Sequence, residues 1–126
     1  KQIVAGNRSE LDDQSIMISE MDPPRPVGIY AATKIWGEAL GRYHSEVNGI
    51  SVICLRLGRV IAGDEPEDDL RRSIHLSRRD AVQAITKSIE APTTLKFACF
   101  YVSSNNPNRW RDNESARANI GYSPQD

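Results

Sequence analysis

Residues 29–58 decide the fold, and they read IYAATKIWGEALGRYHSEVNGISVICLRLG. In the first part of this stretch, apolar side chains recur at three- and four-residue spacing, which predicts a helix over residues 29–47. Its apolar stripe consists of Ile35, Trp36, Ala39, Leu40 and Tyr43. Gly49 follows as the expected helix stop. We expect the stripe to pack against the protein's own sheet, with burial against a second subunit as the alternative.

The second part of the stretch predicts a strand. Residues 51–57 form a short, nearly continuous apolar run that is rich in β-branched side chains. Such runs are typical of strands that are buried on both faces of a parallel sheet. A helix that leads directly into such a strand is half of a unit in which strands and helices alternate.

Outward from this unit, the alternation continues in both directions. Residues 3–5 look like the end of a buried strand, and residues 6–27 form a long, irregular connection with a proline-rich end. Downstream we expect a loop over 58–72, a helix over 80–91 capped by Ser77, a strand over 96–103, and a helix over 112–120 capped by Asp112. This order predicts an α/β fold with a parallel sheet, and more of that sheet is expected before Lys1.

The composition argues against several classes of protein. The chain has 126 residues, 39% of them apolar, which suits one domain of ordinary size. Its 16 basic and 17 acidic residues nearly cancel, which argues against a nucleic-acid-binding surface. No run of about 20 apolar residues predicts a membrane-spanning helix. Cys54 and Cys99 lie in apolar runs, as buried thiols of a reducing compartment do, so a cytoplasmic location is expected.

Tyr30 and Lys34 are the strongest candidates for chemistry. They lie four residues apart at the start of the predicted helix, so both side chains share one face. A tyrosine, with an unperturbed pKa of about 10, is a poor base at pH 7, but a nearby ammonium group favours the phenolate. Such a pair can take a proton from a sugar hydroxyl while a hydride leaves for a nicotinamide. The competing interpretation is a surface Tyr and Lys at chance spacing.

The context of this pair resembles a known family. Residues 30–38 (YAATKIWGE) and 49–58 (GISVICLRLG) resemble the extended short-chain dehydrogenases/reductases, also called the NAD-dependent epimerase/dehydratase family. In that family the Tyr-Lys helix leads into a buried strand that ends in Arg-x-x-Asn or Arg-x-Gly, and a proline-rich turn usually precedes the tyrosine, as Pro26 does here. Within the family, residues 76–80 and 101–126 are most similar to uronate dehydrogenases and their sugar-oxidising relatives.

The resemblance implies a fold and an activity. The fold would be the C-terminal portion of a Rossmann-like doubly wound parallel sheet, with residues 1–126 forming the C-terminal part of one NAD(P)-binding domain and the small substrate-side region. The activity would be an oxidoreductase that uses NAD or NADP on a sugar or sugar acid. Tyr30 would be the general acid/base, and Lys34 would lower the pKa of Tyr30 and hydrogen-bond the nicotinamide ribose.

The resemblance also implies binding residues. Leu57, Gly58 and Arg59 would approach the cofactor. Arg71 or Arg72 would grip a substrate carboxylate, an interaction that suits a bidentate arginine. His75 lies near the same position. Ordinary alternatives remain open for these three, namely a solvated arginine pair beside the acidic run of residues 64–69 and a loop histidine. No metal ligand set is expected.

The chain departs from the family pattern in several places. The catalytic Ser or Thr would lie at or before Lys1, and Ser9 and Ser15 are poor substitutes for it. The Gly-rich turn that holds the dinucleotide pyrophosphate does not occur, so the N-terminal dinucleotide-binding half is expected to be missing. The acidic residue for the adenosine ribose is missing too, which leaves NAD versus NADP open. The chain alone is expected to be inactive.

Two other functions compete with the dehydrogenase. One is a nucleotide-sugar epimerase or dehydratase, although only about 25 residues follow the last predicted strand, which favours a small substrate. The other is a non-catalytic dinucleotide-binding regulator, which would have no need of the Tyr30–Lys34 pair. The expected partner is a small-molecule sugar or sugar acid, with a homodimer as one expected assembly.

Overall fold

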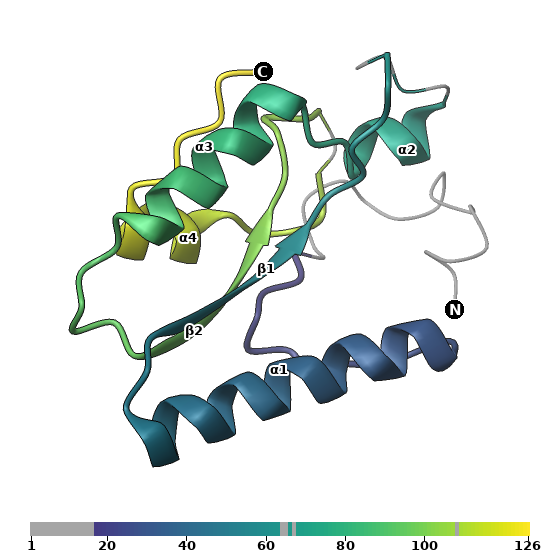
Figure 1. The fold of residues 1–126 in the computed structure, drawn as a ribbon. Helices are drawn as coiled ribbons and strands as arrows, with labels where there is room; N and C mark the ends of the chain where they lie inside the picture. Colours follow the sequence, from purple (N-terminus) through teal and green to yellow (C-terminus); the bar gives the residue numbers. More distant parts are fainter. Residues whose placement is uncertain (1–16, 64–65, 67, 108) are drawn as a thin grey trace.

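The computed structural model describes residues 17–63, 66, 68–107 and 109–126 (Figure 1). The predicted strand over residues 3–5, together with Ser9 and Ser15, lies outside the described residues. The elements within them are α1 (Ile29–Asn48), β1 (Val52–Leu57), α2 (Asp69–Ser73), α3 (Arg78–Ile89), β2 (Phe97–Val102) and α4 (Glu114–Ile120).

Strands β1 and β2 pair in parallel, with a register that runs from Val52 opposite Phe97 to Leu57 opposite Val102. The chain passes from one strand to the other through α2 and α3. Helix α1 covers one face of the strand pair, and α3 and α4 cover the other (Figure 1). The α/β class and the parallel pairing predicted from the sequence are therefore confirmed.

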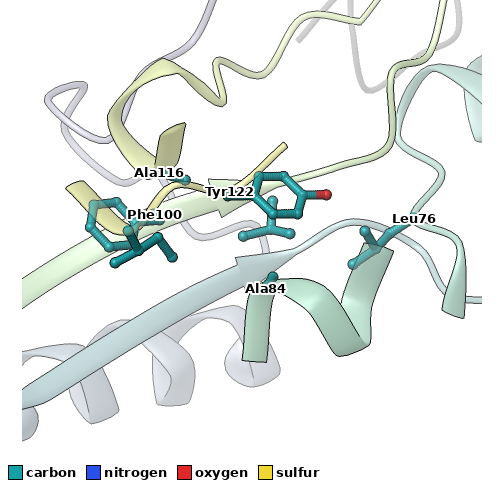
Figure 2. Packing of buried hydrophobic residues seen from close by; sticks show 7 residues of the cluster. Leu76, Ala84, Phe100, Ala116 and Tyr122 are labelled. Atoms are coloured by element: carbon teal, nitrogen blue, oxygen red, sulfur yellow. The ribbon is translucent and has the colours of Figure 1, made fainter. Parts of the chain in front are cut away.

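The hydrophobic core lies on the face of the strands that α3 and α4 cover. Figure 2 shows these side chains gathered between the two helices and the strands. The fully buried Tyr122 donates a hydrogen bond from its hydroxyl to the carbonyl oxygen of Ser103, at 2.9 Å, which satisfies its one polar group. The core residues are Leu76, Ala84, Phe100, Val102, Ala116, Ile120 and Tyr122.

Helix α1 corrects the expectation about its apolar stripe. Trp36 is 67% exposed, and Leu40 and Tyr43 are exposed as well, so most of the stripe does not pack against the sheet. Instead, the helix docks with small and polar side chains. A Cβ on Gly41 would lie 2.9 Å from a methyl carbon of Val52, so only glycine allows so close an approach. Spacing alone identified an apolar face, but the shape of the strand surface selects a different face for contact.

Helix boundaries follow the capping groups. Gly49, with φ 69°, ends α1 as expected, and the Ser77 hydroxyl accepts a hydrogen bond from the Asp80 amide at the start of α3. The loop expected over residues 58–72 contains α2, because the Asp68 side chain caps its first turn by accepting a bond from the Arg71 amide. Helix α4 begins at Glu114, with Asn113 in the N-cap position where Asp112 was expected.

Helix α3 likewise turns small and polar side chains to the core and leaves larger apolar ones exposed. Ala84 and Asp80 are buried, whereas the larger apolar side chains of Val82, Ile85 and Ile89 are exposed.

Within the described residues, no helix is long and apolar enough to cross a membrane.

Candidate active site

Tyr30 and Lys34 lie on the first two turns of α1. Their i, i+4 spacing places the Lys34 ammonium nitrogen 5.0 Å from the centre of the Tyr30 ring, as the sequence predicts. Tyr30 is 75% exposed, so its hydroxyl is open to a ligand. The helix begins after Gly28, whose extended backbone follows the proline-rich turn. The fold therefore presents an amine and a phenol side by side at one end of a helix.

The Tyr30–Lys34 pair opens onto a cleft of about 810 Å³. Its walls come from loop residues 24–26, the first turns of α1, the second half of β1, Tyr101 on β2, and Arg111 in the segment after β2. Because parallel strands end at the same edge of a sheet, the end of β1 and the residues after β2 meet beside the start of α1. Leu57 and Gly58, two of the expected cofactor residues, line this cleft together with the pair.

Gly58 lies in a narrow place. Its amide donates to the Val102 carbonyl at 2.7 Å, and the next residue continues the pairing with a bond from the Arg59 amide to the Ile74 carbonyl, also at 2.7 Å. A Cβ on Gly58 would lie 2.5 Å from the Ile74 carbonyl oxygen. The backbone of this segment is therefore fixed between two neighbouring chain segments, and glycine is the residue that fits there.

The remaining predicted binding residues lie elsewhere. Arg59, Arg71 and His75 line a second, small hollow together with Ile61 and Pro66. Arg71 forms an ion pair with Asp68, with 3.4 Å between Nε and Oδ2. His75 is buried, and Arg72 is exposed and lines neither hollow. The structure thus brings Tyr30, Lys34, Leu57 and Gly58 together but separates them from the three candidates for substrate binding and from Arg59.

Sequence reasoning missed an ion pair next to the site. Glu38 lies one helical turn after Lys34, and Arg56 lies on β1. The Arg56 guanidinium donates to both carboxylate oxygens of Glu38 at 2.8 Å. The hydrogen bond from Arg56 lowers the pKa of Glu38, and the same contact raises the pKa of Arg56. Arg56 itself was a signal in the sequence, because an arginine inside an apolar strand needs a partner for its charge.

Tyr101 and a second arginine, Arg111, complete the wall of the cleft, and Trp110 contacts Arg111. The Arg56 guanidinium lies 5.1 Å from the centre of the Tyr101 ring, and the Arg111 guanidinium lies 5.6 Å from the same ring and 4.9 Å from the Trp110 ring. Burial lowers the pKa of Arg111. Sequence reasoning did not find Arg111, because its distance from Tyr30 along the chain hides their common cleft.

The two cysteines are unsuited to act as nucleophiles. Cys54 and Cys99 are free and lie opposite each other in the strand register. Burial raises the pKa of both thiols, that of Cys99 to about 12, so both stay protonated at neutral pH. No group of three or more His, Cys, Asp or Glu side chains that could bind a metal ion occurs in the described part of the chain.

A family model described as the NAD dependent epimerase/dehydratase family matches residues 4–97. The chain is 32% identical over 125 residues to L-arabinose 1-dehydrogenase (NAD(P)(+)) of Haloferax volcanii, a match that covers 91% of this chain and 48% of that protein. The chain therefore spans about half the length of this relative.

Solved structures match over the same part of the chain. The structure superimposes on glucuronic acid dehydrogenase from Chromohalobacter salexigens with a TM-score of 0.80 and 27% identity, covering 88% of this chain and 40% of that one. A variant of uronate dehydrogenase from Agrobacterium tumefaciens, solved in complex with NAD, matches with a TM-score of 0.76 and 26% identity over the same shares.

Proposed function

Because this chain belongs to the NAD dependent epimerase/dehydratase family, we propose that the whole protein is an NAD-dependent oxidoreductase that oxidises a sugar or sugar acid. The matching proteins include an L-arabinose dehydrogenase, a glucuronic acid dehydrogenase and a uronate dehydrogenase. These names support a small sugar or a uronate as the substrate. We favour a uronate.

One observation carries this proposal. Tyr30 and Lys34 share a cleft with Leu57 and Gly58, at the edge of the sheet where ligands of such folds bind. Tyr30 would accept the proton of the substrate hydroxyl, and the hydride would leave the carbon that carries this hydroxyl for the nicotinamide. Lys34 would stabilise the Tyr30 phenolate before the transfer and hydrogen-bond the nicotinamide ribose.

The residues present fit the nicotinamide end of the cofactor. The cleft offers an ammonium group, an apolar wall at Leu57 and a backbone without a side chain at Gly58. Lys34, Leu57 and Gly58 would hold that end, and bound NAD supplies the hydride acceptor. Arg59 lines the second hollow, so a role at the cofactor would require it to act from there. NADP is the alternative that the assay below separates.

Arg71, Arg72 and His75 remain the candidates for the substrate carboxylate. Arg71 and His75 share the second hollow, where Arg71 contacts Asp68. A carboxylate bound there would compete with Asp68 for the Arg71 guanidinium. The role of these three residues is therefore a proposal that Arg71→Met and Arg72→Met would test through the KM for uronates.

The proposal is tested with the full-length protein by following nicotinamide reduction at 340 nm. Glucuronate, galacturonate and L-arabinose are each offered with NAD and with NADP. We expect reduction with a uronate, and Tyr30→Phe should lower kcat about 100- to 10,000-fold. Tyr43→Phe is the matched control, because Tyr43 is an exposed tyrosine on the same helix outside the cleft.

Other outcomes would favour the competing functions. Retained NAD binding without net reduction of any sugar would point to a nucleotide-sugar epimerase or dehydratase, or to a regulator. Full activity in Tyr30→Phe would overturn the assigned role of the tyrosine.

A further inference from the structure

We propose that Glu38 and Arg56 are positioning residues. Their ion pair fixes the distance of the first turns of α1 from β1 and the rotation of the helix about its axis, and it thereby orients Tyr30 and Lys34 toward the end of β1. This inference rests on the proposed function, because it concerns the same Tyr30–Lys34 site. Both residues line the same cleft, and in this role they act through the placement of Tyr30 and Lys34.

The geometry of the pair restrains both distance and angle. Arg56 donates from Nε to one carboxylate oxygen and from Nη2 to the other, each at 2.8 Å. A two-point contact between planar groups fixes their relative orientation, which a single hydrogen bond does not. The two side chains are only 20% and 18% exposed, so water screens the contact weakly.

The location of the pair explains why the site depends on it. Tyr30, Lys34 and Glu38 follow one another at four-residue intervals, so they share one side of α1. Arg56 precedes Gly58 by two residues on the strand. The pair therefore joins helix and strand one turn beyond Lys34, at the edge of the cleft that both elements line.

The other anchors of α1 lie farther from the site. The Ser45 hydroxyl donates to the Lys96 carbonyl at 2.8 Å, near the C-terminal end of the helix, and Gly41 makes the close approach to Val52. These contacts hold the far half of the helix. Tyr30, at its free end, is largely exposed, so small rotations about the distant anchors would move it most.

Arg56 is itself held from the other side. Its register partner on β2 is Tyr101, and its guanidinium lies over that ring. The hydrogen bond to Arg56 also lowers the pKa of Glu38, so the carboxylate is ionised at neutral pH. A rigid partner and a permanent charge are what a positioning contact requires.

The test must separate positioning from stability. Replacing a buried ion pair by apolar residues of similar volume often leaves stability unchanged or improves it, whereas removing one partner strands a charge. The central variant is therefore the double substitution Glu38→Met with Arg56→Met in the full-length protein, beside the single Glu38→Gln. Glu46→Gln is the matched control, because Glu46 pairs with Arg42 at 3.5 Å on the exposed side of the same helix.

We expect the double variant to keep the Tm of the parent within a few degrees and to lose kcat roughly 10- to 100-fold, because small misplacements of catalytic groups are costly. The loss should fall on kcat while KM stays close to that of the parent, because the variant misplaces the reacting groups and not the binding surfaces. Glu46→Gln should match the parent in kcat and in KM. A stable double variant with unchanged kcat would overturn the proposal.

A second readout does not depend on the substrate. Crystal structures of the parent and of the double variant give the position of the Tyr30 side chain relative to the end of β1. The first turns of α1 should be displaced from β1 in the double variant. If the parent reduces no nicotinamide but this displacement is seen, the proposed function fails while the positioning role stands; if α1 keeps its place, the positioning role fails.

Discussion

Gly58 directly follows β1 and lines the cleft, and the next residue, Arg59, lines the second hollow. The backbone of Gly58 is bonded to the end of β2, and the adjacent Arg59 is bonded to the segment before α3. The absence of a side chain lets three chain segments approach one another beside the Tyr30–Lys34 pair. A single atom added here would push on backbone rather than on a flexible side chain.

We predict that Gly58→Ala destabilises the full-length protein by about 1–3 kcal/mol, because the new Cβ would meet the Ile74 carbonyl oxygen and the side chain of Leu76. Urea unfolding followed by circular dichroism measures the change. Gly37→Ala is the matched control: a Cβ there meets nothing within 4 Å, and in a helix interior alanine should stabilise by about 0.5–1 kcal/mol. Equal stability of both variants would contradict the close packing described for Gly58.

At the scale of elements, the start of α3 organises the C-terminal segment. The buried Asp80 carboxylate accepts bonds from the Ser104 hydroxyl at 2.6 Å and from the Gln125 amide at 2.8 Å. The Ser77 hydroxyl caps the same helix and donates to the Asp126 carboxylate at 2.6 Å. One helix terminus therefore ties together α3, the residues after β2 and the last residues of the chain.

Asp80→Ala should lower the free energy of unfolding of the full-length protein by about 2–4 kcal/mol, because it removes the acceptor of the buried Ser104 hydroxyl and of the part-buried backbone amide of Gln125. Thermal and urea unfolding measure the loss. Asp22→Ala is the control and should cost less than about 1 kcal/mol, since among the described residues the exposed Asp22 carboxylate accepts only from Ser19, three residues before it. Similar losses in both variants would contradict the anchoring role of Asp80.

At the scale of the whole molecule, α1 presents an apolar surface that its own sheet does not cover. Trp36, Leu40, Tyr43 and Val47 are exposed along this surface. A tryptophan, a leucine and a tyrosine on one helix face form a patch of the kind that often marks a contact. The homodimer expected as one assembly from the sequence stays a prediction, and this surface is where it can be tested.

If copies of the protein meet at this surface, Trp36→Glu should lower the mass of the full-length protein in sedimentation from dimer to monomer, because a carboxylate there would lose its hydration on association. Ile89→Glu is the matched control, because Ile89 is an exposed apolar residue on α3, which covers the opposite face of the strands, and it should leave the mass unchanged. A parent that sediments as a monomer, or a dimer that survives Trp36→Glu, would contradict the prediction.

The sequence alone determined the family, the order of the described elements apart from α2, and most of their ends. Local chemistry decides these properties: Gly49 ends α1, Ser77 caps α3, and apolar runs predict the two described strands. The α/β class, the parallel pairing and the resemblance to the epimerase/dehydratase family are confirmed. The closeness of Tyr30 and Lys34 also followed from helical spacing, while their catalytic roles stay predictions.

Only the tertiary structure decided which faces and which distant residues meet. Spacing identified an apolar stripe on α1, but contact with β1 depends on the space left by Gly41 and on the partner that Arg56 requires, so the helix turns the face with Glu38 inward. In the same way, Arg111 joins the Tyr30 cleft while Arg71 and His75 line another hollow. Local patterns cannot establish such groupings, because they arise from packing between segments that are far apart in the chain.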